Sequence, residues 1–91
     1  MADIDWIESD GNYVRLHTGD RSHLLRETMK GVETRLDPSA FVRVHRSAII
    51  AVDRAVTIET RRQGEYLVTL RTGARITSSR AYGERIRTLI R

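Results

Sequence analysis

The sequence predicts a small, mostly β domain that carries one internal helix and one short C-terminal helix. Its 91 residues are enough for a single domain with a thin hydrophobic core. Apolar and polar residues alternate with period two through most of the chain, which is the pattern of half-buried strands. Glycine-containing pairs separate these segments and mark hairpin turns, so we expect the strands to pair antiparallel.

The first strands are expected at Ile4–Glu8 and Tyr13–Thr18. Between them stands the turn Asp10–Asn12, whose Asp-Gly pair favours a positive φ. The two segments therefore form a β-hairpin, and the pair Gly19–Asp20 turns the chain again.

The segment Ser22–Leu36 changes to a helical period and predicts the internal helix. Four of its apolar residues fall at i, i+4, i+7 and i+11, on one face of a helix: Leu25, Met29, Val32 and Leu36. The helix begins at Ser22 or His23, with a short strand running up to Leu24 as an alternative beginning. The pair Asp37–Pro38 ends the helix, because the residue before proline avoids the α region.

Period two returns after the proline and predicts five more strands: Phe41–Val44, Ala48–Ala51, Val56–Arg61, Tyr66–Leu70 and Ala74–Thr77. Gly64 and Gly73 mark hairpin turns among them. The last helix is expected to begin near Ser79, with one apolar face made of Tyr82, Ile86, Leu89 and Ile90. Large apolar side chains are assigned to the core by default: Trp6, Leu25, Met29, Leu36, Phe41 and Ile86.

Charge is unevenly distributed along the chain. Sixteen basic residues, fifteen of them arginine, stand against twelve acidic ones. Residues 1–40 hold five basic and eight acidic side chains, whereas residues 41–91 hold eleven and four. A basic half implies an anionic partner, and nucleic acid is a common one for a small domain. A solvated, arginine-rich surface with no partner is the alternative reading of the same charge.

Residue types argue against an enzyme. There is no cysteine, so neither a disulfide nor a thiolate metal site is expected. The three histidines form no His-Glu-x-x-His pattern. His45, Ser47 and Asp53 are conceivable triad members, but no nucleophile elbow or glycine-rich oxyanion loop accompanies them. We therefore expect no catalysis, no metal and no cofactor.

The sequence also bears on cellular context. No apolar run approaches the roughly 20 residues of a membrane span, and the N-terminal residues lack the apolar core of a signal peptide. We expect a cytoplasmic protein. A strand-like segment begins at Ile4, almost at the first residue, which is compatible with a single domain cut from a longer protein.

Four segments at the expected joints carry a resemblance: Trp6–Val14, Leu24–Met29, Phe41–Ser47 and Ile76–Arg80. In their order and spacing the chain resembles the LytTR family of bacterial DNA-binding domains, over nearly its whole length. The resemblance implies an elongated antiparallel β domain of a transcription regulator, typically a two-component response regulator. It also implies loops that enter successive major grooves of direct-repeat sites in double-stranded DNA, a second copy on the DNA, and a receiver or membrane domain elsewhere in the protein.

Three regions carry the DNA contacts in the family, and each maps onto this chain. They are the loop near Asn12 and Tyr13, the position of Arg46 with Ser47 beside it, and Arg80 of the Ser-Arg pair. An arginine fork can bind guanine O6 and N7 together, asparagine suits adenine edges, and tyrosine suits phosphate or a thymine methyl group. The alternative for each arginine is a surface ion pair, worth under about 1 kcal/mol.

The remaining candidates have two open readings each. His45 either braces the joint or contacts phosphate. Ser47 and Ser79 either donate to phosphate or cap local backbone, and Ser79 is well placed as a helix N-cap. An RNA-binding or protein-interaction β module that uses the same basic surface is the alternative function. The five aromatic residues are few for stacking on single-stranded bases, which favours duplex DNA.

Overall fold

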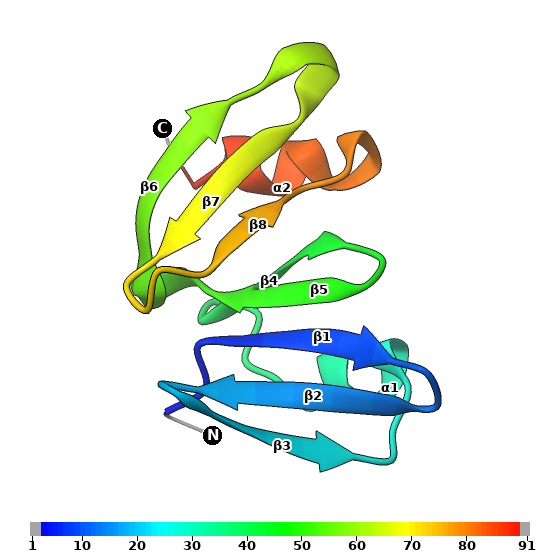
Figure 1. The fold of residues 1–91 in the computed structure, drawn as a ribbon. Helices are drawn as coiled ribbons and strands as arrows, with labels where there is room; N and C mark the ends of the chain where they lie inside the picture. The colour runs from blue at the N-terminus through cyan, green and yellow to red at the C-terminus, as the bar shows by residue number, and fades with distance from the viewer. Residues whose placement is uncertain (1–2, 90–91) are drawn as a thin grey trace.

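The computed structural model describes residues 3–89. The chain folds into two antiparallel sheets (Figure 1). The first sheet has the strand order β3-β2-β1-β5-β4 and the second has the order β6-β7-β8. The first comprises β1 (Trp6–Asp10), β2 (Tyr13–Thr18), β3 (Arg21–Leu25), β4 (Phe41–His45) and β5 (Ala48–Ala51), and the second β6 (Ala55–Thr60), β7 (Tyr66–Leu70) and β8 (Arg75–Thr77). The helices are α1 (Met29–Glu33) and α2 (Gly83–Arg87), with 3-10 turns η1 (Val52–Arg54), η2 (Arg62–Gly64) and η3 (Arg80–Tyr82). The mostly β fold is confirmed.

The predicted first hairpin is present. Asp10 of β1 pairs with Tyr13 of β2, which leaves a two-residue loop, and Gly11 within it has a φ of 62°. An L side chain is strained at this φ, so glycine suits the position. β2 then turns through a second two-residue loop into β3, with Thr18 opposite Arg21.

The predicted helix Ser22–Leu36 is wrong over its first half, where the chain continues as β3 up to Leu25, and at its end, since α1 stops at Glu33 and not at Asp37–Pro38. The alternative of a short strand before the helix is the correct one. β3 pairs along its whole length with β2, and those backbone bonds outweigh a helical side-chain period. The helix starts only at Met29, because the Thr28 hydroxyl accepts a bond from the Gly31 N–H at 2.9 Å and so acts as its N-cap.

The other elements differ less from prediction. The strands predicted at Tyr13–Thr18, Ala48–Ala51 and Tyr66–Leu70 have the observed bounds. β1 begins two residues later than predicted, and the shifts at β4, β6 and β8 are one residue, which is ordinary uncertainty for element ends. The C-terminal helix is split into η3 and α2, and the predicted face residue Ile90 lies outside the described residues.

Two hydrophobic cores lie on opposite faces of the first sheet. One packs α1 against β1, β2 and β5 and includes Ile7, Val14, Met29, Val32, Leu36 and Ile49. The other lies between the two sheets and α2 and includes Val44, Ile50, Tyr66, Val68, Leu70 and Ile86. β5 contributes to both cores and is buried throughout, so its side chains alternate between them. Of the predicted core residues, Met29, Leu36 and Ile86 are buried, whereas Trp6, Leu25 and Phe41 are partly buried.

A buried carboxylate ties together the left-hand end of the domain in Figure 1. Asp5 is only 1% exposed. Its side chain accepts a hydrogen bond from the Gly19 N–H at 2.6 Å and lies 3.4 Å from the Arg54 guanidinium. Arg71 lies further away, at 3.7 Å. An unpaired buried charge is costly, so the fold is stabilised when Asp5 keeps these partners. The partners lie on the β2–β3 turn, η1 and the β7–β8 loop, and Asp5 therefore holds these three segments together.

Candidate nucleic-acid interface

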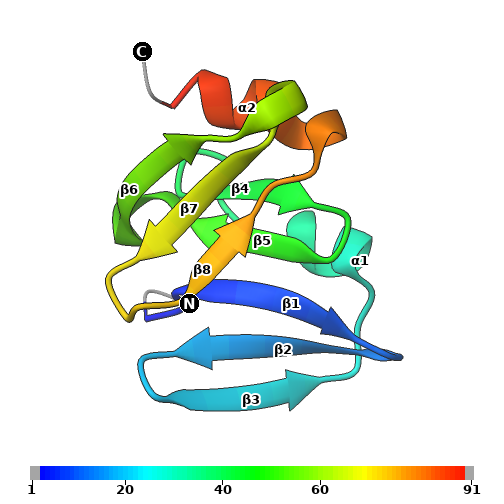
Figure 2. The same ribbon diagram turned by 45° about the horizontal axis from the view of Figure 1, so that its top comes forward.

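The predicted contact loops all lie at the other end of the domain. Figures 1 and 2 show the β1–β2 loop, the β4–β5 turn and the joint after β8 along one edge. Backbone hydrogen bonds join neighbouring loops there. The Ser9 N–H donates to the Ser47 carbonyl at 3.0 Å, and the Ser79 N–H donates to the Val44 carbonyl at 2.9 Å. The three regions therefore form one continuous edge, called the loop edge below.

Arg46 occupies the tip of the β4–β5 turn and is exposed. The pairing register shifts between Arg43 and His45 just before it, which makes the turn irregular. Within residues 3–89 its guanidinium forms no ion pair. Its backbone carbonyl accepts a bond from Arg43 Nη2 at 2.7 Å. The backbone of this turn is thus held while the Arg46 side chain stays available.

His45 and Ser47 bond to each other across the same turn. The Ser47 N–H donates to His45 Nδ1 at 3.1 Å, and the Ser47 hydroxyl lies 2.8 Å from that nitrogen. Nδ1 is therefore an acceptor, and the neutral ring carries its proton on Nε2. This geometry matches a bracing histidine and leaves Nε2 without a partner among the described residues.

Arg43 links the turn to α1 and to η3. Besides the Arg46 carbonyl, it donates from Nε to the His45 carbonyl at 3.3 Å and from Nη1 to Glu33 Oε1 at 3.1 Å. Its guanidinium also lies 5.7 Å from the centre of the Tyr82 ring, within range of a cation–π contact. Sequence reasoning did not identify this role, because nothing in the alternation of β4 shows which carbonyls an arginine side chain will meet.

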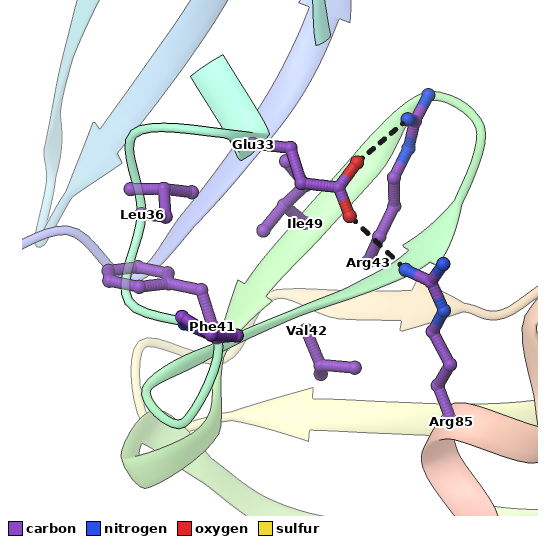
Figure 3. Close-up of a pocket in the computed structure, with 8 residues that line it drawn as sticks. Glu33, Leu36, Phe41, Val42, Arg43, Ile49 and Arg85 are labelled. Atoms are coloured by element: carbon purple, nitrogen blue, oxygen red, sulfur yellow. Dashed lines mark hydrogen bonds and ion pairs between the residues drawn. The ribbon is translucent and has the colours of Figure 1, made fainter. Parts of the chain in front are cut away.

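Glu33 is shared between two arginines (Figure 3). Its second oxygen accepts a bond from Arg85 Nη1 at 3.2 Å, and the Arg85 guanidinium lies 5.0 Å from the Tyr82 ring centre. Glu33, Arg43 and Arg85 line one side of a cavity of about 250 Å³. The apolar lining of that cavity consists of Leu36, Pro38, Phe41, Val42 and Ile49. Through Glu33, α1, β4 and α2 are cross-linked directly behind the loop edge.

Arg80 opens η3 immediately after Ser79 and is exposed. It too forms no ion pair within the part of the chain that the structure describes. Ser79 has the extended backbone of an N-cap, with φ −81° and ψ 159°, but its hydroxyl makes no capping bond. That oxygen is buried with no hydrogen-bond partner among residues 3–89, so the capping alternative for Ser79 is contradicted.

Asn12 and Tyr13 lie at the tip of the first hairpin, and both are exposed. The Arg26 guanidinium lies 5.9 Å from the centre of the Tyr13 ring. This arginine follows β3 and was not predicted as a site residue, because the segment was assigned to a helix. The segment after β3 therefore brings a basic group next to the β1–β2 loop as well.

The arginines near the loop edge differ in whether they have an acidic partner. Three acidic side chains are each bonded to arginine: Asp10 to Arg15 at 2.8 Å, Glu27 to Arg35 at 2.8 Å, and Glu33 to both Arg43 and Arg85. Arg46 and Arg80 remain without ion partners in the described structure. The edge therefore presents positive charge that is not locally neutralised, which attracts a polyanion.

Comparison with known proteins agrees with the sequence resemblance. The family described as LytTr DNA-binding domain matches residues 1–91. The LytTr DNA-binding domain of a methyl-accepting/DNA response regulator from Bacillus cereus superposes with a TM-score of 0.90. That match covers 98% of this chain and 82% of the other at 20% sequence identity, so it shows the same fold. The predicted LytTR-like architecture is confirmed.

The curated relatives include a transcriptional regulator and a sensory transduction protein. The CO-responsive transcriptional regulator RcoM of Rhodospirillum rubrum is 38% identical over 73 residues, covering 80% of this chain and 30% of RcoM. The sensory transduction protein LytT of Bacillus subtilis is 27% identical over 88 residues, covering 97% of this chain and 36% of LytT. The chain thus spans about a third of the length of these relatives. Among residues 3–89, no helix is long and apolar enough to cross a membrane.

Proposed function

This chain belongs to the LytTR family of DNA-binding domains, and we propose that it regulates transcription by inserting the loops of its loop edge into successive major grooves of double-stranded DNA. The role is binding, and we assign no catalytic step to it. The observation that carries the proposal is the exposure of Arg46 and Arg80, without ion partners among residues 3–89, on neighbouring loops. The backbone bond from Ser79 to Val44 joins the Arg80 segment to β4, two residues before Arg46.

The two arginines supply the sequence reading. A guanidinium fork that binds guanine O6 and N7 contributes about 1–3 kcal/mol of discrimination against a wrong base pair. Such discrimination requires a fixed starting point for the side chain, because a loose loop would lose entropy on binding. The bonds from Arg43 to the turn carbonyls supply that support for Arg46.

The dimensions of the domain suit successive grooves. Its longest principal extent is 33 Å, and one turn of B-DNA advances by about 34 Å. A row of loops along the long axis can therefore meet the major groove at two places on one face of the duplex. No helix of the described structure exceeds five residues, which makes a recognition helix of the helix-turn-helix kind a poor explanation for this fold.

The other candidates take supporting roles in the proposal. Asn12 suits an adenine edge and Tyr13 a phosphate or a thymine methyl group. His45 holds the turn through Ser47 and presents Nε2–H to a phosphate oxygen. Ser79 acts through its backbone, since its hydroxyl is buried.

The proposal extends to the whole regulator only by inference from the family. We infer that two copies of the domain sit on direct repeats and that the protein acts in the cytoplasm, where bacterial DNA is found. A receiver or membrane domain elsewhere in the protein would pass a signal to the domain.

The decisive experiment begins with selection of bound sequences from a random duplex pool. Fluorescence anisotropy then compares the selected duplex, a scrambled duplex, single strands and RNA of the same sequence. We expect the selected duplex to bind at least tenfold more tightly than the scrambled one. Tighter binding to RNA would reject the proposal and favour the RNA-binding alternative. Equal binding to both duplexes would also reject it and favour a non-specific role.

Variants assign the reading to residues. Arg80→Ala should remove most of the preference for the selected duplex and leave the melting temperature nearly unchanged, because its side chain is exposed. Arg46→Ala should do the same. Arg21→Ala is the matched control, since Arg21 is an exposed arginine at the opposite end of the first sheet. Equal loss of preference in the control would contradict the assignment.

A further inference from the structure

The β6–β7 turn also reaches the loop edge, although it is not one of the three contact regions of the family. Figures 1 and 2 show it beyond the joint after β8, next to the start of α2. It carries two consecutive arginines, Arg61 and Arg62, both exposed. Neither forms an ion pair within the described part of the chain. Two unneutralised guanidiniums thus lie at the end of the same row as Arg46 and Arg80.

The turn packs closely against the side-chain stem of Arg80 and the backbone of Gly83. Gln63 and Gly64 both have left-handed φ values, 63° and 79°, which fold the chain sharply. A Cβ on Gly64 would lie 3.3 Å from Arg80 Cγ, and a Cβ on Gly83 would overlap the Gly64 carbonyl oxygen. The turn therefore lies directly beside Arg80 and the start of α2.

The surface around the two arginines suits a phosphate group. They line an open polar hollow of about 500 Å³ together with Thr60, Thr77 and Glu65. Two guanidiniums and two hydroxyls supply donors of the kind that contact DNA backbone oxygens. Glu65 is the single acid in this lining, so the local charge remains positive.

We propose that the β6–β7 turn is a fourth DNA contact, in which Arg61 and Arg62 bind backbone phosphates next to the base pair that Arg80 reads. The inference rests on the proposed function. This contact adds affinity and salt dependence and carries no sequence information, because phosphates are the same at every position. It also fixes the depth to which Arg80 enters the groove.

The test is the salt dependence of duplex binding by the double variant Arg61→Ala/Arg62→Ala, measured by anisotropy. Each phosphate contact contributes about 0.9 to the slope of log affinity against log salt. The variant should therefore lose about 1.8 of that slope. Over the tenfold range from 1 M to 0.1 M salt, this difference in slope corresponds to roughly a sixty-fold weaker affinity at 0.1 M. The ratio of affinities for selected and scrambled duplex should stay at the wild-type value.

Two controls accompany the test. Arg61→Lys/Arg62→Lys keeps the charge and should restore most of the slope. Arg21→Ala/Arg75→Ala removes the same charge from the first residues of β3 and β8, two exposed positions at the opposite end, and should change the slope much less. Melting temperatures of all three double variants show that each remains folded.

The outcomes separate this inference from the proposed function. Failure of the wild-type domain to prefer any duplex would defeat the proposed function itself. Normal preference by the wild type, together with a wild-type slope in the alanine double variant, would overturn the β6–β7 contact alone. A changed selected-to-scrambled ratio in that variant would overturn its phosphate role, since it would mean that these arginines read bases. An equal loss of slope in the opposite-end control would reduce the effect to net charge and equally overturn it.

Discussion

Replacing Arg43 by methionine should both destabilise the domain and impair its reading of DNA. Methionine keeps an unbranched stem and removes the guanidinium that holds the β4–β5 turn. The change deletes the 2.7 Å bond to the Arg46 carbonyl, the 3.3 Å bond to the His45 carbonyl and the 3.1 Å bond to Glu33. The Arg43 side chain is only 15% exposed, so water replaces these bonds incompletely.

The expected cost follows from these bonds. A hydrogen bond to a charged group contributes about 1.5–3 kcal/mol. The short bond to the turn counts fully, the long one counts little, and Glu33 keeps its bond to Arg85 and is not left unpaired. The free energy of unfolding should therefore fall by about 2–4 kcal/mol, or roughly 10–20 °C in melting temperature for a domain of this size. That loss is large but smaller than the total stability of a typical domain.

Urea unfolding followed by the fluorescence of Trp6, the single tryptophan, measures this cost. Arg35→Met is the matched control, because Arg35 forms an exposed ion pair with Glu27 at 2.8 Å that should contribute under about 1 kcal/mol. Equal unfolding midpoints for the two variants would refute the reasoning about the turn.

DNA binding gives the second readout for the Arg43 variant. At a temperature where the variant is fully folded, the selected-to-scrambled affinity ratio should fall, because Arg46 then projects from a turn with fewer anchors. A destabilised variant that keeps the wild-type ratio would show that the order of the turn does not depend on Arg43.

Two further predictions concern single contacts. Gly83→Ala should lower the free energy of unfolding by about 1–3 kcal/mol, because the new Cβ meets the Gly64 carbonyl; an unfolding midpoint equal to that of the exposed control Ala81→Ser would contradict the close approach. The N–H and hydroxyl of Ser39 donate to the Asp37 carboxylate and hold its pKa below the ordinary value. Since the folded-state pKa is depressed, the associated stabilisation is present above the unfolded pKa of about 3.9 and is lost as pH falls through the folded value. Ser39→Ala should raise the pKa of Asp37 only part of the way back to the ordinary value, because the bond from the backbone N–H remains. A carboxyl titration by NMR with an unchanged midpoint would refute the role of the hydroxyl.

Local chemistry explains why much of the strand layout was predictable. The loop at Gly11 needs a positive φ and the flanking residues alternate, so the first hairpin follows from a dozen residues. The error at Ser22–Leu36 has the same origin, since a helical period and a partnered strand compete there. Pairing with β2 decided the outcome, and a single segment does not reveal which neighbour will offer its backbone.

The candidate site divides in a similar way. The motif segments place Arg46 and Arg80 at strand joints, and their exposure is consistent with that expectation. The support behind them was not predictable: Arg43 meets Glu33 and Tyr82 only because α1, β4 and η3 converge. The environment of the Ser79 hydroxyl was not predictable either. Its sequence position favoured a capping role, but the hydroxyl is buried at the joint and makes no capping bond.

By itself the sequence determined the strands other than β3, most of their turns, the family and the arginines at the joints, because alternation and turn chemistry act over a few neighbouring residues. Only the tertiary structure decided that Asp5 meets Arg54 across 49 positions and that Glu33 meets Arg85 across 52. It also decided that the β6–β7 turn lies beside Arg80. Contacts of this range depend on how two sheets and two short helices pack around a shared strand, β5, and no local pattern encodes that packing.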